Sequence, residues 1–187
     1  VEEFSIPPST WEAPSKLLAI SDVEGNHDAL VSFLKGCSVI DWAGNWTFGT
    51  GHLLFNGDIV DRGRDVAKVL GLIRRLEREA KASGGAVHYV LGNHESMITA
   101  GDVRYVNALP LFAATRIGLR YEELFAANTE FGRWFRTRNS VMKIGKLLFV
   151  HAGYSPQLNA LGLSMDEINE RIRASLDPPV PPKGLPL

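Results

Sequence analysis

The order of apolar and polar positions along the chain predicts alternating strands and helices. Short apolar runs of strand length occupy 17–21, 53–56 and 87–91. Between the first two runs, the segment HDALVSFLKG carries apolar residues at helical spacing. Between the second and third, 64–83 repeats an apolar residue every three or four positions, with charged residues between them. This order of strand, helix, strand, helix and strand is typical of a parallel α/β sheet.

The segments on either side of this core are assigned by composition and period. We expect an extended arm at 1–15, one α/β domain at 16–176 and a proline-rich tail or linker at 177–187. Within the domain, 107–138 is predicted to be a mostly helical, cap-like region. The stretch VMKIGKLLFV predicts a hairpin that turns at Gly145 and ends at His151, and Ser164 is a suitable N-cap for a final helix.

Composition limits what such a domain does. The 187 residues include 20 lysines and arginines against 21 acids, so no basic footprint for nucleic acid or for a membrane surface is predicted. No apolar run reaches the roughly 18 residues needed to span a bilayer. We therefore expect a soluble protein, with its compartment (cytoplasm or periplasm) and its oligomeric state left open. The single cysteine, Cys37, excludes an internal disulfide framework.

Polar clusters follow the predicted strands at the point where each strand ends. These clusters are SDVEGN at 21–26, NGDIVDRG at 56–63, LGNHES at 91–96 and VHAGYS at 150–155. The carboxyl ends of parallel strands form one common edge, where ligands bind, so the four clusters are expected to converge. Taken alone, any one of these acids is as typical of a helix N-cap or a loop as it is of a functional site. Four clusters together favour a shared site.

The donor types in these clusters favour a pair of metal ions. They are carboxylates, an amide and imidazole, with no thiolate: Asp22, Glu24, Asp58, Asn93 and His151. Clustered carboxylates repel one another and are costly to desolvate unless cations neutralise them. Two-metal hydrolases hold their ions roughly 3.5 to 4 Å apart and clamp phosphoryl oxygens. Asp58 lies between the flanking clusters and is the natural bridging ligand, whereas Asp61 and Arg62 lie too far along the loop to ligate.

The motifs together resemble a known family. They are Asp22-x-Glu24-Gly25-Asn26, Gly57-Asp58-x-x-Asp61-Arg62-Gly63, Gly92-Asn93-His94-Glu95 and His151-Ala152-Gly153. The set resembles the calcineurin-like metallophosphoesterases of the phosphoprotein phosphatase superfamily, and over 17–156 it is most similar to the bacterial Shewanella-like phosphatases. The resemblance implies a four-layer αββα sandwich, in which two sheets are flanked by helices. It leaves open whether the last strands of that fold belong to this chain.

The resemblance also implies a metal ligand set. Asp22 and Glu24 would bind one ion, and Asp58 would bridge to a second ion held by Asn93 and His151. The ions would be divalent or trivalent: manganese, iron, zinc or magnesium. The family usually has histidine at the position of Glu24, and the extra carboxylate is expected to shift the preference toward harder ions.

Catalytic and substrate-binding roles are implied in the same way. His94 would protonate the leaving group, oriented by Asp61, while Arg62 and the amide of Asn93 would hold the phosphoryl oxygens. Arg104 and Tyr105 follow closely along the chain, and either line the cleft or serve structure.

The function implied is hydrolysis of a phosphomonoester by a metal-bridged hydroxide. Phosphorylated protein side chains are the favoured substrates, with serine or threonine against tyrosine left open. A dinucleotide polyphosphate hydrolase is the alternative enzyme, and small phosphorylated molecules also fit. The family has a further histidine and commonly an arginine downstream, and no histidine follows His151. The remaining alternative is therefore a truncated, catalytically weak binding module with an incomplete metal pair.

Overall fold

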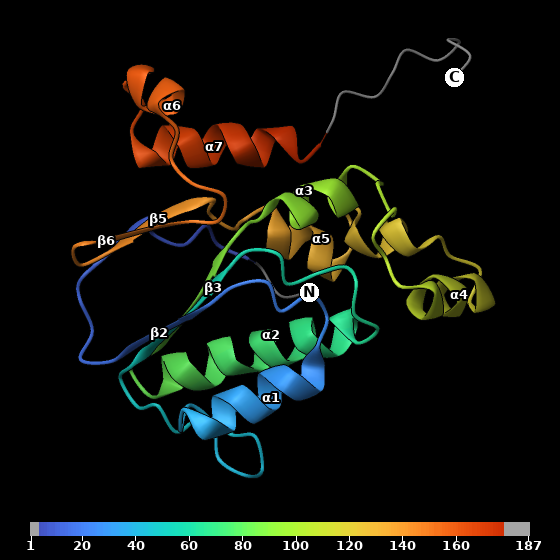
Figure 1. Ribbon diagram of the computed structural model, residues 1–187, viewed down its shortest axis with the longest axis horizontal. Coiled ribbons are helices and arrows are strands. Elements are labelled where there is room, and N and C mark those ends of the chain that lie inside the picture. Colours follow the sequence, from blue (N-terminus) through green and yellow to red (C-terminus); the bar gives the residue numbers. More distant parts are fainter. Residues whose placement is uncertain (1–3, 178–187) are drawn as a thin grey trace.

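The computed structural model describes residues 4–177, which form four layers (Figure 1). From one side to the other the layers are two helices, a parallel sheet, a mixed sheet and one helix: α1 (His27–Gly36) and α2 (Val66–Ala82); β2 (Leu17–Ile20), β3 (His52–Asn56) and β4 (Ala86–Val90); β1 (Thr10–Trp11), β5 (Val141–Ile144) and β6 (Leu147–Val150); and α7 (Met165–Ser175). The predicted αββα sandwich is therefore confirmed. In the described part of the chain, no helix is both long and apolar enough to cross a membrane.

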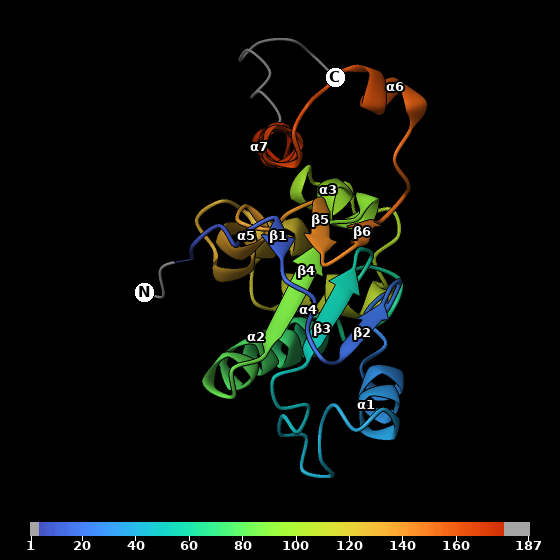
Figure 2. The ribbon, with the colours of Figure 1, turned by 90° about the vertical axis from the view of Figure 1, so that its left-hand side faces the viewer.

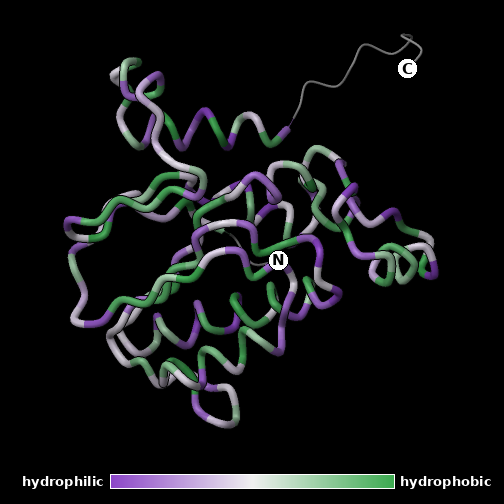
Figure 3. Tube along the Cα trace, viewed as in Figure 1, coloured by the Kyte–Doolittle hydropathy of each residue, from purple (hydrophilic) through white to green (hydrophobic). Residues whose placement is uncertain are grey.

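The parallel sheet is buried on both faces at its central strand β3 and in the second half of β4, whereas β2 is only partly buried. Its strands lie in the order β2-β3-β4, and all pair in parallel. Leu53 and Phe55 face the large core shared with α1 and α2, while Leu54 and Val90 face a smaller core beneath the mixed sheet. The hydrophobic colour that runs through these strands in Figure 3 agrees with burial on both sides. The expected alternation of strands and helices is confirmed, and it places three strand ends at one edge.

The mixed sheet combines a strand from the start of the chain, β1, with two later strands, β5 and β6. β5 and β6 form the expected antiparallel hairpin, with Gly145 at φ 57° in its turn. The segment predicted as an extended arm contributes β1, which pairs in parallel with β5. Helix α7 begins at the N-cap Ser164 and covers this sheet, where Asn169 hydrogen-bonds to both backbone groups of Val141. The second sheet thereby fixes His151, which follows β6.

Shorter helices surround the edge where the strands end. They are α3 (Asn93–Thr99), α4 (Ala108–Arg116), the 3₁₀ helix η1 (Tyr121–Phe125), α5 (Glu130–Phe135) and α6 (Pro156–Ala160). The helical region expected at 107–138 corresponds to α4, η1 and α5. Helix α3 begins at Asn93, inside the third polar cluster. Except for Asp177, the proline-rich tail lies outside the described residues.

A buried histidine pair under β1 predicts sensitivity to acid. His88 is 3% exposed, its Nε2 lies 3.0 Å from Nδ1 of His52, and both rings contact Trp11. Burial, and then the charge of His52, lower the pKa of His88 from 6.5 to about 3. Between pH 6.5 and about 3 the unfolded chain binds a proton at His88 and the folded chain does not. The free energy of unfolding therefore decreases as the pH falls through this range.

We expect the wild type to lose about 1 kcal/mol more unfolding free energy than His88→Gln between about pH 7 and about pH 5.5. Urea denaturation of both proteins at the two pH values measures the difference. His27→Gln, which changes a histidine outside this pair, is the control and should lose as much stability as the wild type. Equal losses for the wild type and His88→Gln would contradict the prediction.

Candidate metal centre

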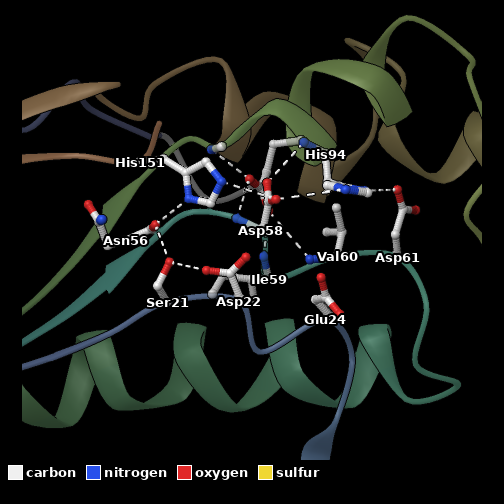
Figure 4. Close-up of polar contacts among 12 residues, drawn as sticks. Ser21, Asp22, Glu24, Asn56, Asp58, Ile59, Val60, Asp61, His94 and His151 are labelled. Carbon is white, nitrogen blue, oxygen red and sulfur yellow. Dashed lines mark hydrogen bonds and ion pairs between the residues drawn. The ribbon is translucent and has the colours of Figure 1, made fainter. Parts of the chain in front are cut away.

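The polar clusters converge at the carboxyl edge of the parallel sheet (Figure 4). The parallel pairing of β2 with β3 continues into their loops, where the amide of Asp22 donates to the Gly57 carbonyl and that of Glu24 to the Asp58 carbonyl, each at 3.1 Å. Gly57 is required at this point, since a Cβ there would lie 2.6 Å from the His151 ring. The second sheet therefore delivers its histidine directly onto the loop that carries Asp58.

The backbone at this edge is strained. Five non-glycine residues with positive φ belong to the predicted site: Asp22, Glu24, Asp58, Asp61 and Arg62, with φ between 48° and 71°. Such conformations cost free energy and persist where the surrounding structure imposes them, most often at functional sites. Three of these residues, Asp22, Glu24 and Arg62, line one hollow between the two loops.

Three of the predicted metal ligands lie together. The ligand atoms of Asp22, Asp58 and His151 are all within 4.8 Å of one another. The main-chain carbonyl of Asn56 orients two of them, because it accepts from Nδ1 of His151 at 2.7 Å and from the Ser21 hydroxyl at 2.9 Å. That hydroxyl also donates to the Asp22 carboxylate. Ser21 and the Asn56 carbonyl thus hold the ligands from behind.

This donor set fits a divalent metal ion. With Nδ1 of His151 committed to the Asn56 carbonyl, its Nε2 is free to offer a lone pair, 3.0 Å from Oδ2 of Asp58. Burial lowers the pKa of His151, but the hydrogen bond to Asn56 and the charges of Asp58 and Asp22 outweigh it and raise the pKa above its usual value. A cation between these groups would offset the repulsion of the carboxylates and displace the imidazole proton.

His94 lies against this trio with its ring fixed. Nδ1 of His94 is 2.7 Å from Oδ2 of Asp61, and Nε2 is 3.7 Å from Oδ2 of Asp58. Both His94 and Asp61 are buried. Burial raises the pKa of Asp61, and the hydrogen bond with His94 offsets only part of that rise. A histidine with one nitrogen anchored and the other directed at the centre is the geometry of an acid or base.

Arg62 and Tyr105 form the exposed rim beside His94. The centroid of the Tyr105 ring lies 5.1 Å from that of the His94 ring and 5.8 Å from the Arg62 guanidinium carbon. The Arg62 amide also donates to the Tyr105 carbonyl at 2.9 Å, and Asn107 donates to the Arg62 carbonyl. The Arg62 side chain is 53% exposed and pairs with the Glu24 carboxylate. Glu24 is therefore held by Arg62 and is not one of the three ligands whose atoms lie together.

Two other predicted residues are placed less closely. Asn93 is exposed at the first position of α3, which leaves its amide accessible at the edge of the site. The Arg104 guanidinium is bound to Asp102 by contacts of 2.9 and 2.7 Å, as the structural alternative for this residue expects. All the predicted roles stay predictions: metal binding by Asp22, Glu24, Asp58, Asn93 and His151, catalysis by His94, Asp61 and Arg62, and substrate binding by Arg62, Asn93, Arg104 and Tyr105.

Glu95 is the residue whose importance the sequence understates. It is completely buried, and its carboxylate accepts from the amides of Asp58, Ile59, Val60 and Gly92 and from the Tyr89 hydroxyl at 2.7 to 3.4 Å. One carboxylate therefore shapes the loop that carries Asp58 and joins it to α3. The motif GNHE contains Glu95, but the sequence pattern alone does not show whether this carboxylate binds a ligand or stabilises the loop.

A buried acid–histidine site at the carboxyl edge of an αββα sandwich defines a metal-dependent hydrolase class. Residues 15–179 match the family described as calcineurin-like phosphoesterase. The match includes every residue of the candidate site, so the chain belongs to the calcineurin-like phosphoesterase family. Members of this family generally use a dinuclear metal centre.

Solved and curated relatives narrow the comparison. The chain is 41% identical to a cold-active protein-tyrosine phosphatase of a psychrophilic Shewanella species, with a TM-score of 0.90 over 93% of this chain and 53% of that one. It is 38% identical over 96 residues to Shewanella-like protein phosphatase 2 of Arabidopsis thaliana, covering 51% of this chain and 25% of the relative. It is 26% identical to Shewanella-like protein phosphatase 1 of Plasmodium berghei, over 87% of this chain and 45% of the relative. The chain thus spans about half or less of the length of these relatives.

Proposed function

We propose that this chain is the metal-dependent phosphatase domain of a protein that removes phosphate from phosphorylated proteins. The observation that carries the proposal is the Asp61–His94 pair, set with its free nitrogen toward the Asp22, Asp58 and His151 trio. The phosphatase names of the relatives support the substrate class. This substrate class includes the phosphates of serine, threonine and tyrosine.

The chain's own residues account for binding and proton transfer. Asp22, Asp58 and His151, joined by Glu24 and Asn93, would hold two ions of manganese, iron, zinc or magnesium. When bound, such ions neutralise phosphoryl charge and activate water for in-line attack. Arg62, exposed above the loop, can reach the phosphoryl oxygens and stabilise their charge. His94, oriented by Asp61, delivers a proton from Nε2 to the leaving oxygen.

The role of His94 predicts a dependence on the leaving group. We expect His94→Asn to lower kcat by on the order of a hundredfold or more for phosphoserine peptides, whose alkoxide needs a proton to leave. For para-nitrophenyl phosphate the loss should be much smaller, because nitrophenolate leaves without protonation. Steady-state kinetics on both substrates measure this ratio, and His27→Asn is the matched control. Equal losses on the two substrates would exclude His94 as the proton donor.

The proposal as a whole is tested by a substrate panel under a manganese titration. We expect saturable, metal-dependent release of phosphate from phosphotyrosyl or phosphoseryl peptides, and much slower turnover of diadenosine tetraphosphate. The reverse preference would favour the dinucleotide polyphosphate hydrolase. Metal analysis after dialysis gives the number of ions that the chain retains. If it retains at most one ion and hydrolyses none of the substrates, the phosphatase proposal is wrong and the binding module is favoured.

A further inference from the structure

The free edge of β4, on the side away from β3, is only partly closed by other backbone. β4 is the last strand of the order β2-β3-β4, and Figure 2 shows the N-terminal segment passing on the side of this strand. At its carboxyl end the edge is capped, since the amide of Leu91 donates to the Asn139 carbonyl at 2.8 Å. Earlier in β4 the amide of Ala86 donates toward β3, to Gly51. By strand alternation, Val87 therefore turns its N–H and C=O away from β3, toward the open edge.

Neither backbone group of Val87 meets a partner across this edge within residues 4–177. The N-terminal segment runs past this edge without a backbone hydrogen bond to Val87, and its Pro7 and Pro8 have no N–H to donate. Their carbonyls are used elsewhere, by the side-chain amide of Asn139 at 3.2 and 3.3 Å. Such an unpaired edge is a template for another extended chain.

A hollow of about 530 Å³ lies between this edge and the N-terminal segment. Its apolar lining includes Phe4, Ile6 and Trp11, and Ile6 is 57% exposed. The far wall is fixed in place: the Phe4 ring lies 4.7 Å from the Arg74 guanidinium carbon, and Arg138 donates to the Ser5 carbonyl. The wall of the hollow that faces β4 is thus preformed.

The charge of this hollow is one-sided. Among residues 4–177, its lining has four cations, Arg74, Arg78, Lys81 and Arg138, and one carboxylate, that of Glu77. Glu77 is shared by Arg74 and Arg138, whereas Arg78 and Lys81 are exposed and form no salt bridge in the described part of the chain. His88 is uncharged near neutral pH, because burial lowers its pKa to about 3. In a chain with a net charge of −1, this local excess of positive charge selects an acidic partner.

We propose that the hollow beside β4 is a docking site for an extended acidic peptide, which adds as a strand at Val87 and sets its acidic side chains against Arg78 and Lys81. Strand addition supplies main-chain hydrogen bonds, while pockets and charges supply selectivity. The site is separate from the metal centre, because its residues belong to the N-terminal segment, α2, β4 and the segment from Arg138 to Met142, and not to the loops at the strand ends. It would recruit a protein with an acidic strand, independently of whether that protein is phosphorylated.

The probe is a short blocked peptide of alternating glutamate and valine, titrated into the full chain by calorimetry. We expect saturable binding together with slower hydrogen exchange at the amide of Val87, read by NMR. The double variant Arg78→Glu with Lys81→Glu should weaken binding roughly tenfold or more, the effect of turning two exposed attractive pairs into repulsive ones. The matched control, Arg116→Glu with Lys146→Glu, reverses two exposed charges elsewhere and should bind as the wild type does.

Two further probes separate strand addition from simple charge attraction. The same glutamate–valine peptide, methylated on alternate backbone nitrogens, should lose binding. A peptide of alternating lysine and valine should not bind. The proposal is overturned if the glutamate–valine peptide does not bind, if its binding survives the double charge reversal, or if Val87 gains no protection. It is also overturned if inorganic polyphosphate competes fully and the methylated peptide binds equally. Asp58→Asn should leave peptide binding unchanged, so failure here and failure of the phosphatase activity are distinguishable.

Discussion

Asp58→Asn is expected to abolish both metal binding and turnover. Asp58 is 4% exposed and stands between His151, whose Nε2 is 3.0 Å from Oδ2, and His94, whose amide donates to Oδ1 at 3.0 Å. An amide at this position keeps one oxygen but loses the negative charge that holds cations between two loops. The loss of several kcal/mol of transition-state stabilisation corresponds to a fall in kcat/KM on the order of a thousandfold or more.

Hydrolysis of para-nitrophenyl phosphate across a manganese titration measures the turnover, and metal analysis after dialysis measures the binding. Glu170→Gln, an exposed carboxylate on α7, is the control and should match the wild type in both. Circular dichroism establishes that the Asp58→Asn variant is folded. If that folded variant kept its metal content and turned over within a few-fold of the wild type, the assignment of Asp58 as the shared ligand would be wrong.

Glu95→Ala is expected to have the largest effect on stability. Its carboxylate accepts five hydrogen bonds in a fully buried position, four of them from backbone amides. Removing the acceptor leaves those donors without partners, and an unsatisfied buried donor costs roughly 1 to 3 kcal/mol before relaxation. We expect a total loss of about 3 to 5 kcal/mol, allowing for water that enters the gap.

Urea denaturation in the presence of a chelator measures this loss without a contribution from bound metal. Glu95→Gln keeps one acceptor oxygen and should lose an intermediate amount. Glu170→Ala, at an exposed helix position, should stay within about 0.5 kcal/mol of the wild type. A loss below about 1 kcal/mol for Glu95→Ala would show that the loop after β3 holds its shape without the carboxylate.

Much of the fold and the centre of the site follow from pattern alone. Apolar runs of strand length, separated by helical periods, identify the parallel sheet, and the polar residues at the strand ends identify its edge as the site. Because strand ends in a parallel sheet share an edge, Asp22, Asp58 and His94 are brought together without any knowledge of packing. The convergence of these residues is therefore a prediction that sequence reasoning can make.

The remainder depends on groups that leave no mark in the pattern. The Asn56 carbonyl that orients Asp22 and His151 is a backbone atom, and every residue has one. The pairing of β1 with β5 joins Thr10 to Lys143, a long-range contact between strands too short for a period to appear. Glu24 and Arg62, which pair with each other, both have positive φ, and their residue types do not predict this conformation. Local sequence therefore predicts which elements form better than it predicts which distant groups meet.

The Asn56 carbonyl has a further consequence for how this site tolerates change. Because a main-chain oxygen contacts His151 directly and Asp22 through Ser21, the orientation of these two predicted metal ligands depends on the alignment of β3 with its neighbours. The Asn56 side chain adds a separate contact, because its Nδ2 donates to the Val150 carbonyl at 3.3 Å, directly before His151. A shift of β3 by one residue would instead move another carbonyl into place and disorganise the pocket, so insertions are compatible with the site only where they leave the strand pairing unchanged.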